Sequence, residues 1–195
     1  MCRTTPLSAL VCILLVATVL VARPTPLNAQ AADRIGAPSL VLLVRHAEKA
    51  AEPASDPPLT AAGVARAQAL AAALRDAGVT AIITTQLRRT RETAQPLATT
   101  RGLTPEVVPI SRGAIAAHVE AAMAAIRRHA GGVVLVVGHN NSVPAIVAAL
   151  GGPRLPDICE SVYANLVVLV PSGREVRLVQ SHYGAADSDP GPECK

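Results

Sequence analysis

Arginine and histidine residues follow three separate short apolar runs of this 195-residue chain. Arg45 and His46 come directly after the first run. Arg89 lies just beyond the second run, and His139 follows the third, which is almost pure valine. A guanidinium group presents N–H donors in a fork that matches two phosphate oxygens at once. A neutral imidazole among arginines keeps one ring nitrogen that can attack phosphorus. Brought together, these residue types predict a site that binds or transfers a phosphoryl group.

The elements that must position these residues alternate between strand and helix. The sequence predicts strands over 40–44, 80–84, 106–110 and 132–137, helices over 60–76, 87–98, 115–129 and 143–150, and a terminal hairpin over 162–170 and 175–180. Continuous apolar strands alternating with helices are typical of a mostly parallel sheet with helices on both faces. Ligands of such sheets bind outside the carboxyl ends of the strands, where the arginines and histidines are expected. We therefore predict a single three-layer α/β/α domain over residues 32–184, followed by a flexible C-terminal tail over 185–195.

The composition excludes two broad classes of protein. Half of the residues are apolar and only 16% are charged, so the chain has ample apolar surface for a core and is not disordered. Tyr163 and Tyr183 are its only aromatic residues, which excludes a nucleic-acid binder that works by base stacking. Arg3 and Arg23 lie in an N-terminal segment, and without them 16 basic residues stand against 14 acidic ones. That balance predicts no polyanion-binding surface.

The N-terminus is typical of a secretory signal peptide. Residues 7–21 form an uninterrupted apolar run that is preceded by Arg3 and followed by Arg23. The small residues Ala29 and Ala31 predict cleavage after Ala31 or, less favourably, after Ala29. Residues 1–31 would then be removed, and the mature protein would be periplasmic or secreted. An uncleaved membrane anchor is the alternative, although the run is shorter than the ~20 apolar residues that a membrane span needs.

Two cysteines, Cys159 and Cys194, remain once the signal peptide is removed. In an oxidising compartment they could pair and join the C-terminal segment to the domain. The alternative is a partly buried Cys159 and a free thiol near the C-terminus. The spacing of two cysteines does not decide between these interpretations.

Four segments of the chain resemble motifs of the histidine phosphatase superfamily, whose fold is that of phosphoglycerate mutase. In chain order they read VLLVRHAEK (41–49), LTAAGVARAQAL (59–70), TQLRRTRETA (85–94) and VVLVVGHNN (133–141). The resemblance implies that His46 is the nucleophile and carries the phosphoryl group as a phosphohistidine. It also implies that Arg45, Arg89 and His139 hold that group. A short exported phosphatase fits better than a mutase, because the chain lacks room for the longer insertions of mutases.

Some positions refine the resemblance or depart from it. Arg89 rather than Arg88 matches the second arginine of the family, because it stands four residues after Thr85. Ala47 replaces the usual glycine after the nucleophile, and a Thr-Gln pair replaces the usual Ser-Pro. The second histidine is followed by Asn140 and not by aspartate, so the chain does not resemble the acid-phosphatase and phytase branch.

The general acid of the reaction has no clear candidate. In the mutase-like branch it is a carboxylate that follows the third strand, but here that stretch, 109–120, ends in Glu120 well inside a predicted helix. Glu48 and Asp56, near the nucleophile, and Glu160, near the hairpin, are the other candidates. Each fits a solvated or structural carboxylate better than an acid. An enzyme of this type could also act on a substrate with a good leaving group, which needs little protonation.

No metal or other cofactor is predicted, because no group of His, Cys, Asp or Glu residues has the spacing of metal ligands. The remaining histidines, His118, His129 and His182, are interpreted as structural or exposed. His129 ends a predicted helix, where a histidine interacts favourably with the helix dipole.

The residues and the resemblance together predict an exported phosphatase that hydrolyses a small phosphomonoester or a similar phosphoryl compound. Two alternatives stay open. One is a phosphate-binding module with weak or no turnover, which the missing acid favours. The other is a membrane-anchored phosphatase of a lipid or envelope phosphate, which requires that the segment 7–21 is retained. The physiological substrate and the oligomeric state are not predicted.

Overall fold

The computed structural model describes residues 40–172 and 175–188. The described strands are β1 (Leu40–Arg45), β2 (Val79–Thr84), β3 (Glu106–Val107), β4 (Val133–Gly138), β5 (Asn165–Ser172) and β6 (Glu175–His182). The described helices are α2 (Ala61–Ala73), α3 (Arg88–Arg101), α4 (Ile115–Arg128) and α5 (Ser142–Ala149). The predicted signal peptide over 1–31 lies outside the described residues.

The strands form one six-stranded sheet in the order β3-β2-β4-β1-β5-β6. The first four strands, β1 to β4, run parallel to one another. Strand β5 runs antiparallel to β1, and β6 runs antiparallel to β5. Arg45 at the end of β1 is level with Gly138 of β4, and Thr84 of β2 is level with Val137 of β4. The residues that follow these three strands therefore emerge side by side at one edge of the sheet.

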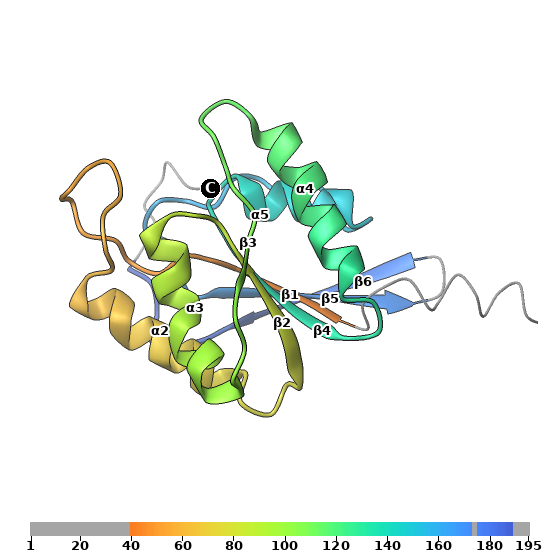
Figure 1. Ribbon diagram of the computed structural model, residues 1–195, viewed down its shortest axis with the longest axis horizontal. Helices are drawn as coiled ribbons and strands as arrows, with labels where there is room; N and C mark the ends of the chain where they lie inside the picture. Colours follow the sequence, from red (N-terminus) through yellow and green to blue (C-terminus); the bar gives the residue numbers. More distant parts are fainter. Residues whose placement is uncertain (1–39, 173–174, 189–195) are drawn as a thin grey trace, which may run out of the picture.

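Helices cover both faces of the sheet, with α2 and α3 on one side and α4 and α5 on the other (Figure 1). The side chains of β1 alternate between the two layers: Leu42 and Val44 pack in the core beneath α2 and α3, and Val41 and Leu43 pack in the core beneath α4 and α5. A strand buried on both faces reads as a continuous apolar run, which is the pattern seen in the sequence. The prediction of a single α/β domain with a mostly parallel sheet is confirmed.

Strand β3 is shorter than the predicted strand over 106–110. Val107 pairs with Thr84, the last residue of β2, and the N–H group of Val108 donates to the Thr84 carbonyl at 2.8 Å. Beyond that point β2 offers no partner, and Pro109 has no N–H group with which to continue a ladder. Residues 109–114 therefore form a loop at the carboxyl edge of the sheet.

Helix α2 begins directly against the segment that follows β1. Its N-cap is Thr60, whose side-chain oxygen accepts a hydrogen bond from the N–H group of Gly63. The Thr60 N–H group donates to the Glu48 carbonyl at 2.9 Å. A Cβ atom on Gly63 would lie 2.2 Å from the Glu48 carbonyl oxygen, so only glycine allows this approach. The helix thereby fixes the chain two residues beyond His46.

The segment that follows β6 returns to the domain. Arg66 of α2 donates a hydrogen bond to the carbonyl of Ala185 at 2.9 Å and lies 3.5 Å from the carboxylate of Asp187. The same carboxylate accepts hydrogen bonds from the N–H groups of Tyr163 and Ala164. The segment 185–195 was predicted as a flexible tail, and its first residues make these contacts, while 189–195 lie outside the described residues.

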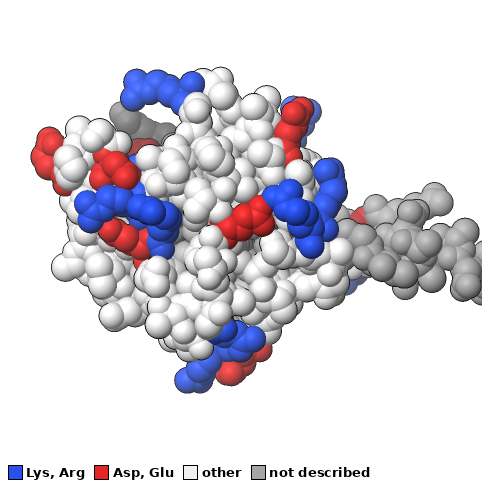
Figure 2. Space-filling model, viewed as in Figure 1, with Lys and Arg blue, Asp and Glu red and all other residues white. Residues whose placement is uncertain are grey.

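The surface drawn in Figure 2 carries basic and acidic side chains in small groups separated by wide uncharged areas. This face has no continuous basic patch of the kind that binds polyanions. Within residues 40–172 and 175–188, no helix is both long enough and apolar enough to cross a bilayer.

Candidate active site

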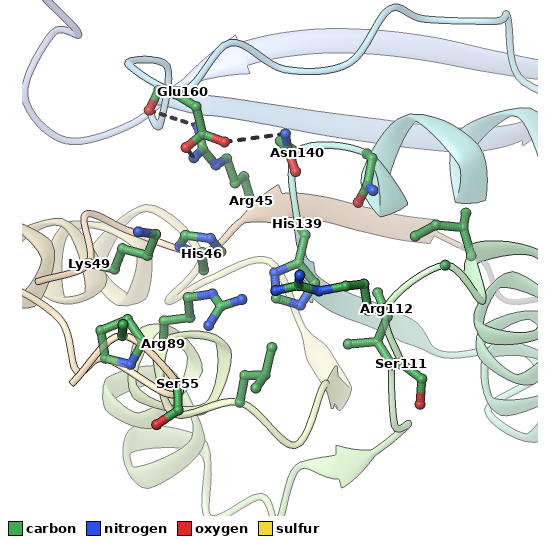
Figure 3. Close-up of a pocket in the computed structure, with 17 residues that line it drawn as sticks. Arg45, His46, Lys49, Ser55, Arg89, Ser111, Arg112, His139, Asn140 and Glu160 are labelled. Atoms are coloured by element: carbon green, nitrogen blue, oxygen red, sulfur yellow. Dashed lines mark hydrogen bonds and ion pairs between the residues drawn. The ribbon is translucent and has the colours of Figure 1, made fainter. Parts of the chain in front are cut away.

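A cavity of about 510 Å³ opens at the carboxyl edge of the sheet, and all four predicted site residues line it. These residues are Arg45, His46, Arg89 and His139. They come from the ends of β1 and β4 and from the first turn of α3 (Figure 3). Residues far apart in the sequence therefore meet in one place, as the strand-end argument predicts.

His46 is a buried, neutral imidazole with one committed ring nitrogen. Its side chain is 4% exposed, and Nδ1 lies 2.8 Å from the carbonyl oxygen of Ala47. A carbonyl only accepts, so Nδ1–H is the donor and Nε2 keeps its lone pair. Burial lowers the pKa of His46 to about 3, and the charges of Arg45 and Arg89 act in the same direction, against the opposing effect of the Ala47 hydrogen bond. Nε2 is thus an unprotonated nitrogen at neutral pH.

His139 lies beside His46, with 5.4 Å between the ring centroids and an angle of 64° between the ring planes. Burial, followed by the charges of His46 and Arg89, lowers the pKa of His139 to about 3. Its Nε2 is 3.2 Å from the hydroxyl oxygen of Thr85, which fixes the ring orientation. Its backbone N–H group donates to the hydroxyl oxygen of Ser142, the first residue of α5, at 2.8 Å. Thr85 therefore fixes the ring, and Ser142 fixes the backbone that carries it.

Arg89 faces the cavity, whereas its neighbour Arg88 does not line it. Arg88 instead pairs with Glu92 at 3.0 Å on the exposed side of α3. The Nε atom of Arg89 is buried and has no hydrogen-bond partner in the described part of the chain. The hydroxyl group of Thr93 donates to the Arg89 carbonyl at 2.7 Å and accepts from the N–H group of Ala47 at 2.9 Å. Thr93 thus joins the start of α3 to the segment that carries His46.

Arg45 has a structural task that the sequence analysis missed. Its side chain is 2% exposed, and Nη1 donates to the carbonyls of Cys159, Glu160 and Val162 at 2.6–3.0 Å. Its Nη2 donates to the Glu160 carboxylate at 2.6 Å, and its guanidinium carbon lies 4.3 Å from the centre of the Tyr163 ring. Arg45 therefore holds the segment that leads into β5. Its Nε atom is buried and has no hydrogen-bond partner among the described residues.

Of the four predicted candidates for the general acid, Glu160 alone lines the cavity. Its carboxylate accepts hydrogen bonds from Arg45 at 2.6 Å and from the side-chain amide of Asn140 at 3.4 Å. Glu48 instead pairs with Arg66, and Asp56 accepts a hydrogen bond from the backbone N–H group of Arg88. Glu120 is exposed on α4. The structure therefore brings one of these carboxylates to the site, with one of its oxygens already committed to Arg45.

Several residues of the site were not predicted. Lys49 and Arg112 line the cavity, Lys49 from the segment after β1 and Arg112 from the loop between β3 and α4. Both are ordinary basic residues in loops, and their spacing carries no signal. Thr85, Thr90 and Thr93 are buried hydroxyl residues around the start of α3. A sequence signal exists for the last two, because threonines three residues apart share one face of a helix.

Of the remaining histidines, His182 is exposed, whereas His118 and His129 make structural contacts, as does Cys159. Nδ1 of His118 lies 3.0 Å from the carbonyl of Pro109, and Nε2 of His129 lies 3.0 Å from the carboxylate of Glu106. Cys159 is disulfide-bonded, and Cys194, one possible partner in the sequence analysis, lies outside the described residues. Within the described ranges, no three His, Cys, Asp or Glu side chains gather as metal ligands do.

A family sequence model and several solved structures are similar to this chain. Residues 41–112 match the sequence model of the histidine phosphatase superfamily (branch 1), a range that contains Arg45, His46 and Arg89. No curated protein sequence matches the chain. The protein histidine phosphatase SixA, solved with tungstate, is 19% identical over 73% of this chain and 96% of its own, with a TM-score of 0.58. A candidate phosphohistidine phosphatase SixA from Agrobacterium tumefaciens is 24% identical over 76% of this chain and 99% of its own, with a TM-score of 0.51.

A third solved structure, the mycobacterial glucosyl-3-phosphoglycerate phosphatase Rv2419c, is 16% identical over 76% of this chain and 99% of its own, with a TM-score of 0.53. At these identities the likenesses concern the fold. The fold and the family match together support a phosphatase enzyme with an α/β fold like that of phosphoglycerate mutase. Residues 41–112, which carry Arg45, His46 and Arg89, match the histidine phosphatase superfamily, and the fold of the described chain is that of its solved members.

The low pKa values of the two site histidines predict a loss of stability in mild acid. Burial lowers the pKa of His46 and of His139 to about 3, whereas unfolded histidines titrate near 6.5. Between these values the unfolded state binds more protons. The free energy of unfolding should therefore fall as the pH drops below 6.5, by up to about 1.4 kcal/mol per pH unit for each histidine. Above pH 6.5 the two residues contribute no pH dependence.

Urea unfolding between pH 6.5 and 5 measures this slope above the range in which ordinary carboxylates titrate. His46→Gln should reduce the slope, because it removes one of the two groups. His182→Gln, at an exposed position at the end of β6, should leave the slope as in the wild type. An equal slope in the wild type and in His46→Gln would show that His46 does not titrate as stated.

Proposed function

We propose that this protein is an exported phosphatase that hydrolyses a phosphomonoester or a similar phosphoryl compound through a phosphohistidine on His46. The observation that carries the proposal is the geometry of that imidazole. Its Nδ1–H group is held by the Ala47 carbonyl, so the unprotonated Nε2 is the nitrogen left to attack. Arg89 and His139 line the same cavity, where they can contact the oxygens of a phosphoryl group.

The proposed reaction has two steps. In the first, Nε2 of His46 forms a bond to phosphorus while the bond to the leaving group breaks, and the leaving group departs with the electron pair. In the second, a water molecule attacks phosphorus, the P–N bond breaks, and inorganic phosphate leaves the neutral imidazole. Arg89, the Nε–H group of Arg45 and His139 stabilise the charge on the equatorial oxygens in both steps.

The scarcity of carboxylates in the site favours one kind of substrate. Glu160 is the one carboxylate in the described lining of the cavity, and Arg45 holds one of its oxygens. A leaving group that departs with little protonation fits such a site better than an alkoxide does. The imidazole of a phosphohistidine is a leaving group of this kind, and SixA, which has a similar fold, is described as a protein histidine phosphatase. Phosphohistidine therefore belongs among the substrates to test beside aryl phosphates.

Two features support export. The segment 1–31 has the parts of a signal peptide. In addition, Cys159 is disulfide-bonded, and disulfide bonds persist in oxidising compartments. A membrane-anchored phosphatase would instead retain the segment 7–21, and N-terminal sequencing of the exported protein distinguishes the two forms.

Hydrolysis of p-nitrophenyl phosphate by the purified domain over residues 32–195, with and without a chelator, tests the activity. This substrate has a good leaving group, so a missing acid does not hide the reaction. We expect hydrolysis that resists the chelator and that is inhibited by vanadate, a mimic of the pentacoordinate state. If the protein binds vanadate and yet hydrolyses neither the aryl phosphate nor a phosphohistidine, it is a phosphate-binding module and the proposal is wrong.

A further inference from the structure

The cavity holds more positive charge than a phosphoryl group requires. Its lining contains four cationic side chains and one carboxylate, namely Arg45, Lys49, Arg89, Arg112 and Glu160. A phosphomonoester carries a charge of about −1.5 to −2 at pH 7. Because Glu160 pairs with Arg45 at 2.6 Å, the other three cations face at most two negative charges. The excess positive charge indicates a further anionic group on the ligand.

Arg112 is the cation placed to meet such a group. It lies in the loop between β3 and α4, and its exposed side chain makes no hydrogen bond or ion pair with the described residues. Figure 3 shows it reaching toward the space in front of His139, on the side of the cavity away from Lys49. The positive charges that act most strongly on His46 are those of Arg45, Arg89 and Lys49. Arg112 therefore stands at the mouth of the cavity and not among the groups around the nucleophile.

The size and the lining of the cavity leave room for the rest of the ligand. A volume of about 510 Å³ lies within the range of pockets that hold whole small organic molecules. Leu87, Ile110 and Ile115 contribute apolar surface to the same lining. An organic body can thus lie against these side chains, with its phosphoryl group at His46 and its other end at Arg112.

We propose that Arg112 binds a second anionic group of the substrate, a carboxylate or a further phosphate, and so selects phosphorylated organic anions over phosphomonoesters with a neutral leaving group. The inference rests on the proposed function, because it concerns the substrate of the same site. Carboxylate and phosphate share the oxygen acceptors that a guanidinium fork binds, and both are attracted by its charge.

A matched pair of aryl phosphates tests the inference. One is 3-carboxyphenyl phosphate and the other is 3-carbamoylphenyl phosphate, which has nearly the same shape but no second charge. We expect the wild type to favour the carboxylate by roughly fivefold in kcat/KM, the effect of one exposed ion pair, and the preference to shrink in 1 M salt. In Arg112→Gln the ratio should fall to about one. The bisphosphate of the same ring, assayed beside them, shows which of the two anions is favoured.

Two control variants separate recognition by Arg112 from general effects of charge. Arg127→Gln removes an exposed positive charge in the last turn of α4, away from the cavity lining, and should keep the wild-type ratio. Lys49→Gln should lower kcat/KM for both substrates alike, because Lys49 acts on His46. A wild-type preference that survives in Arg112→Gln, or no preference for either anion, overturns the inference while the phosphatase activity stands. A wild type that hydrolyses none of the compounds contradicts the proposed function itself.

Discussion

Replacing His46 by alanine should abolish turnover and leave the fold intact. The imidazole supplies the nitrogen that bonds to phosphorus. In the other histidine of the site, His139, Nε2 already contacts the Thr85 hydroxyl, whereas in His46 the backbone carbonyl binds Nδ1–H and leaves Nε2 free. We expect kcat/KM for an aryl phosphate to fall on the order of 10⁴-fold or more, as for other essential nucleophiles. The residue lies just beyond the end of β1, outside the packed layers of the sheet. Circular dichroism, and urea unfolding above pH 6.5, should therefore resemble those of the wild type.

Trapping of the phosphoenzyme distinguishes the loss of a nucleophile from a general loss of activity. A phosphohistidine is labile in acid and stable in alkali, so wild-type enzyme quenched during turnover of a labelled substrate should retain alkali-stable phosphate. His46→Ala should retain none. His182→Ala, at an exposed histidine, is the matched control and should keep both the rate and the label. A labelled intermediate in His46→Ala would place the nucleophile at another residue.

Much of the fold is predictable from the sequence because burial on both faces of a sheet leaves a direct pattern. Strands β1 and β4 are continuous apolar runs, and each side chain in them has a layer of helices to meet. The predicted third strand was too long because the length of β3 depends on the strand beside it, β2. β3 lies at the edge of the sheet and ends where β2 ends, a limit that residues 106–110 do not encode by themselves.

Some residues of the candidate site are likewise predictable from the sequence, and others are not. His46 and His139 are found from the sequence because each follows its own strand directly, and parallel strands bring such residues to one edge. The hydrogen bonds from Arg45 to backbone carbonyls within 159–162 join residues more than 110 positions apart. No pattern in either segment predicts these bonds. Arg112 belongs to a loop whose path is set by the early end of β3. Loop positions of this kind depend on tertiary contacts and not on periodicity.

The second large effect is expected from Arg89→Ala, which should weaken both phosphate binding and the rate. The side chain lines the cavity, and its Nε atom is buried without a hydrogen-bond partner among the described residues, so this donor is not used within the described fold. A charge-assisted contact to the phosphoryl oxygens acts in the ground state and strengthens in the transition state. We expect kcat/KM to fall about 10²–10³-fold and vanadate or phosphate to bind more weakly. Steady-state kinetics and calorimetric titration measure the two effects.

The same variant should not lose stability, which distinguishes Arg89 from a structural arginine. Burial lowers the pKa of Arg89, against the attraction of Asp56 and together with the repulsion from Arg45, so the folded protein holds this charge at a cost. Removing it should leave the melting temperature unchanged or raise it, as is common where a site sacrifices stability for function. Arg88→Ala is the matched control, because Arg88 pairs with Glu92 outside the cavity lining, and its activity should be near that of the wild type. Activity lost equally in both variants, or a large fall in the melting temperature of Arg89→Ala, would mean that Arg89 supports the start of α3 and does not hold the phosphoryl group.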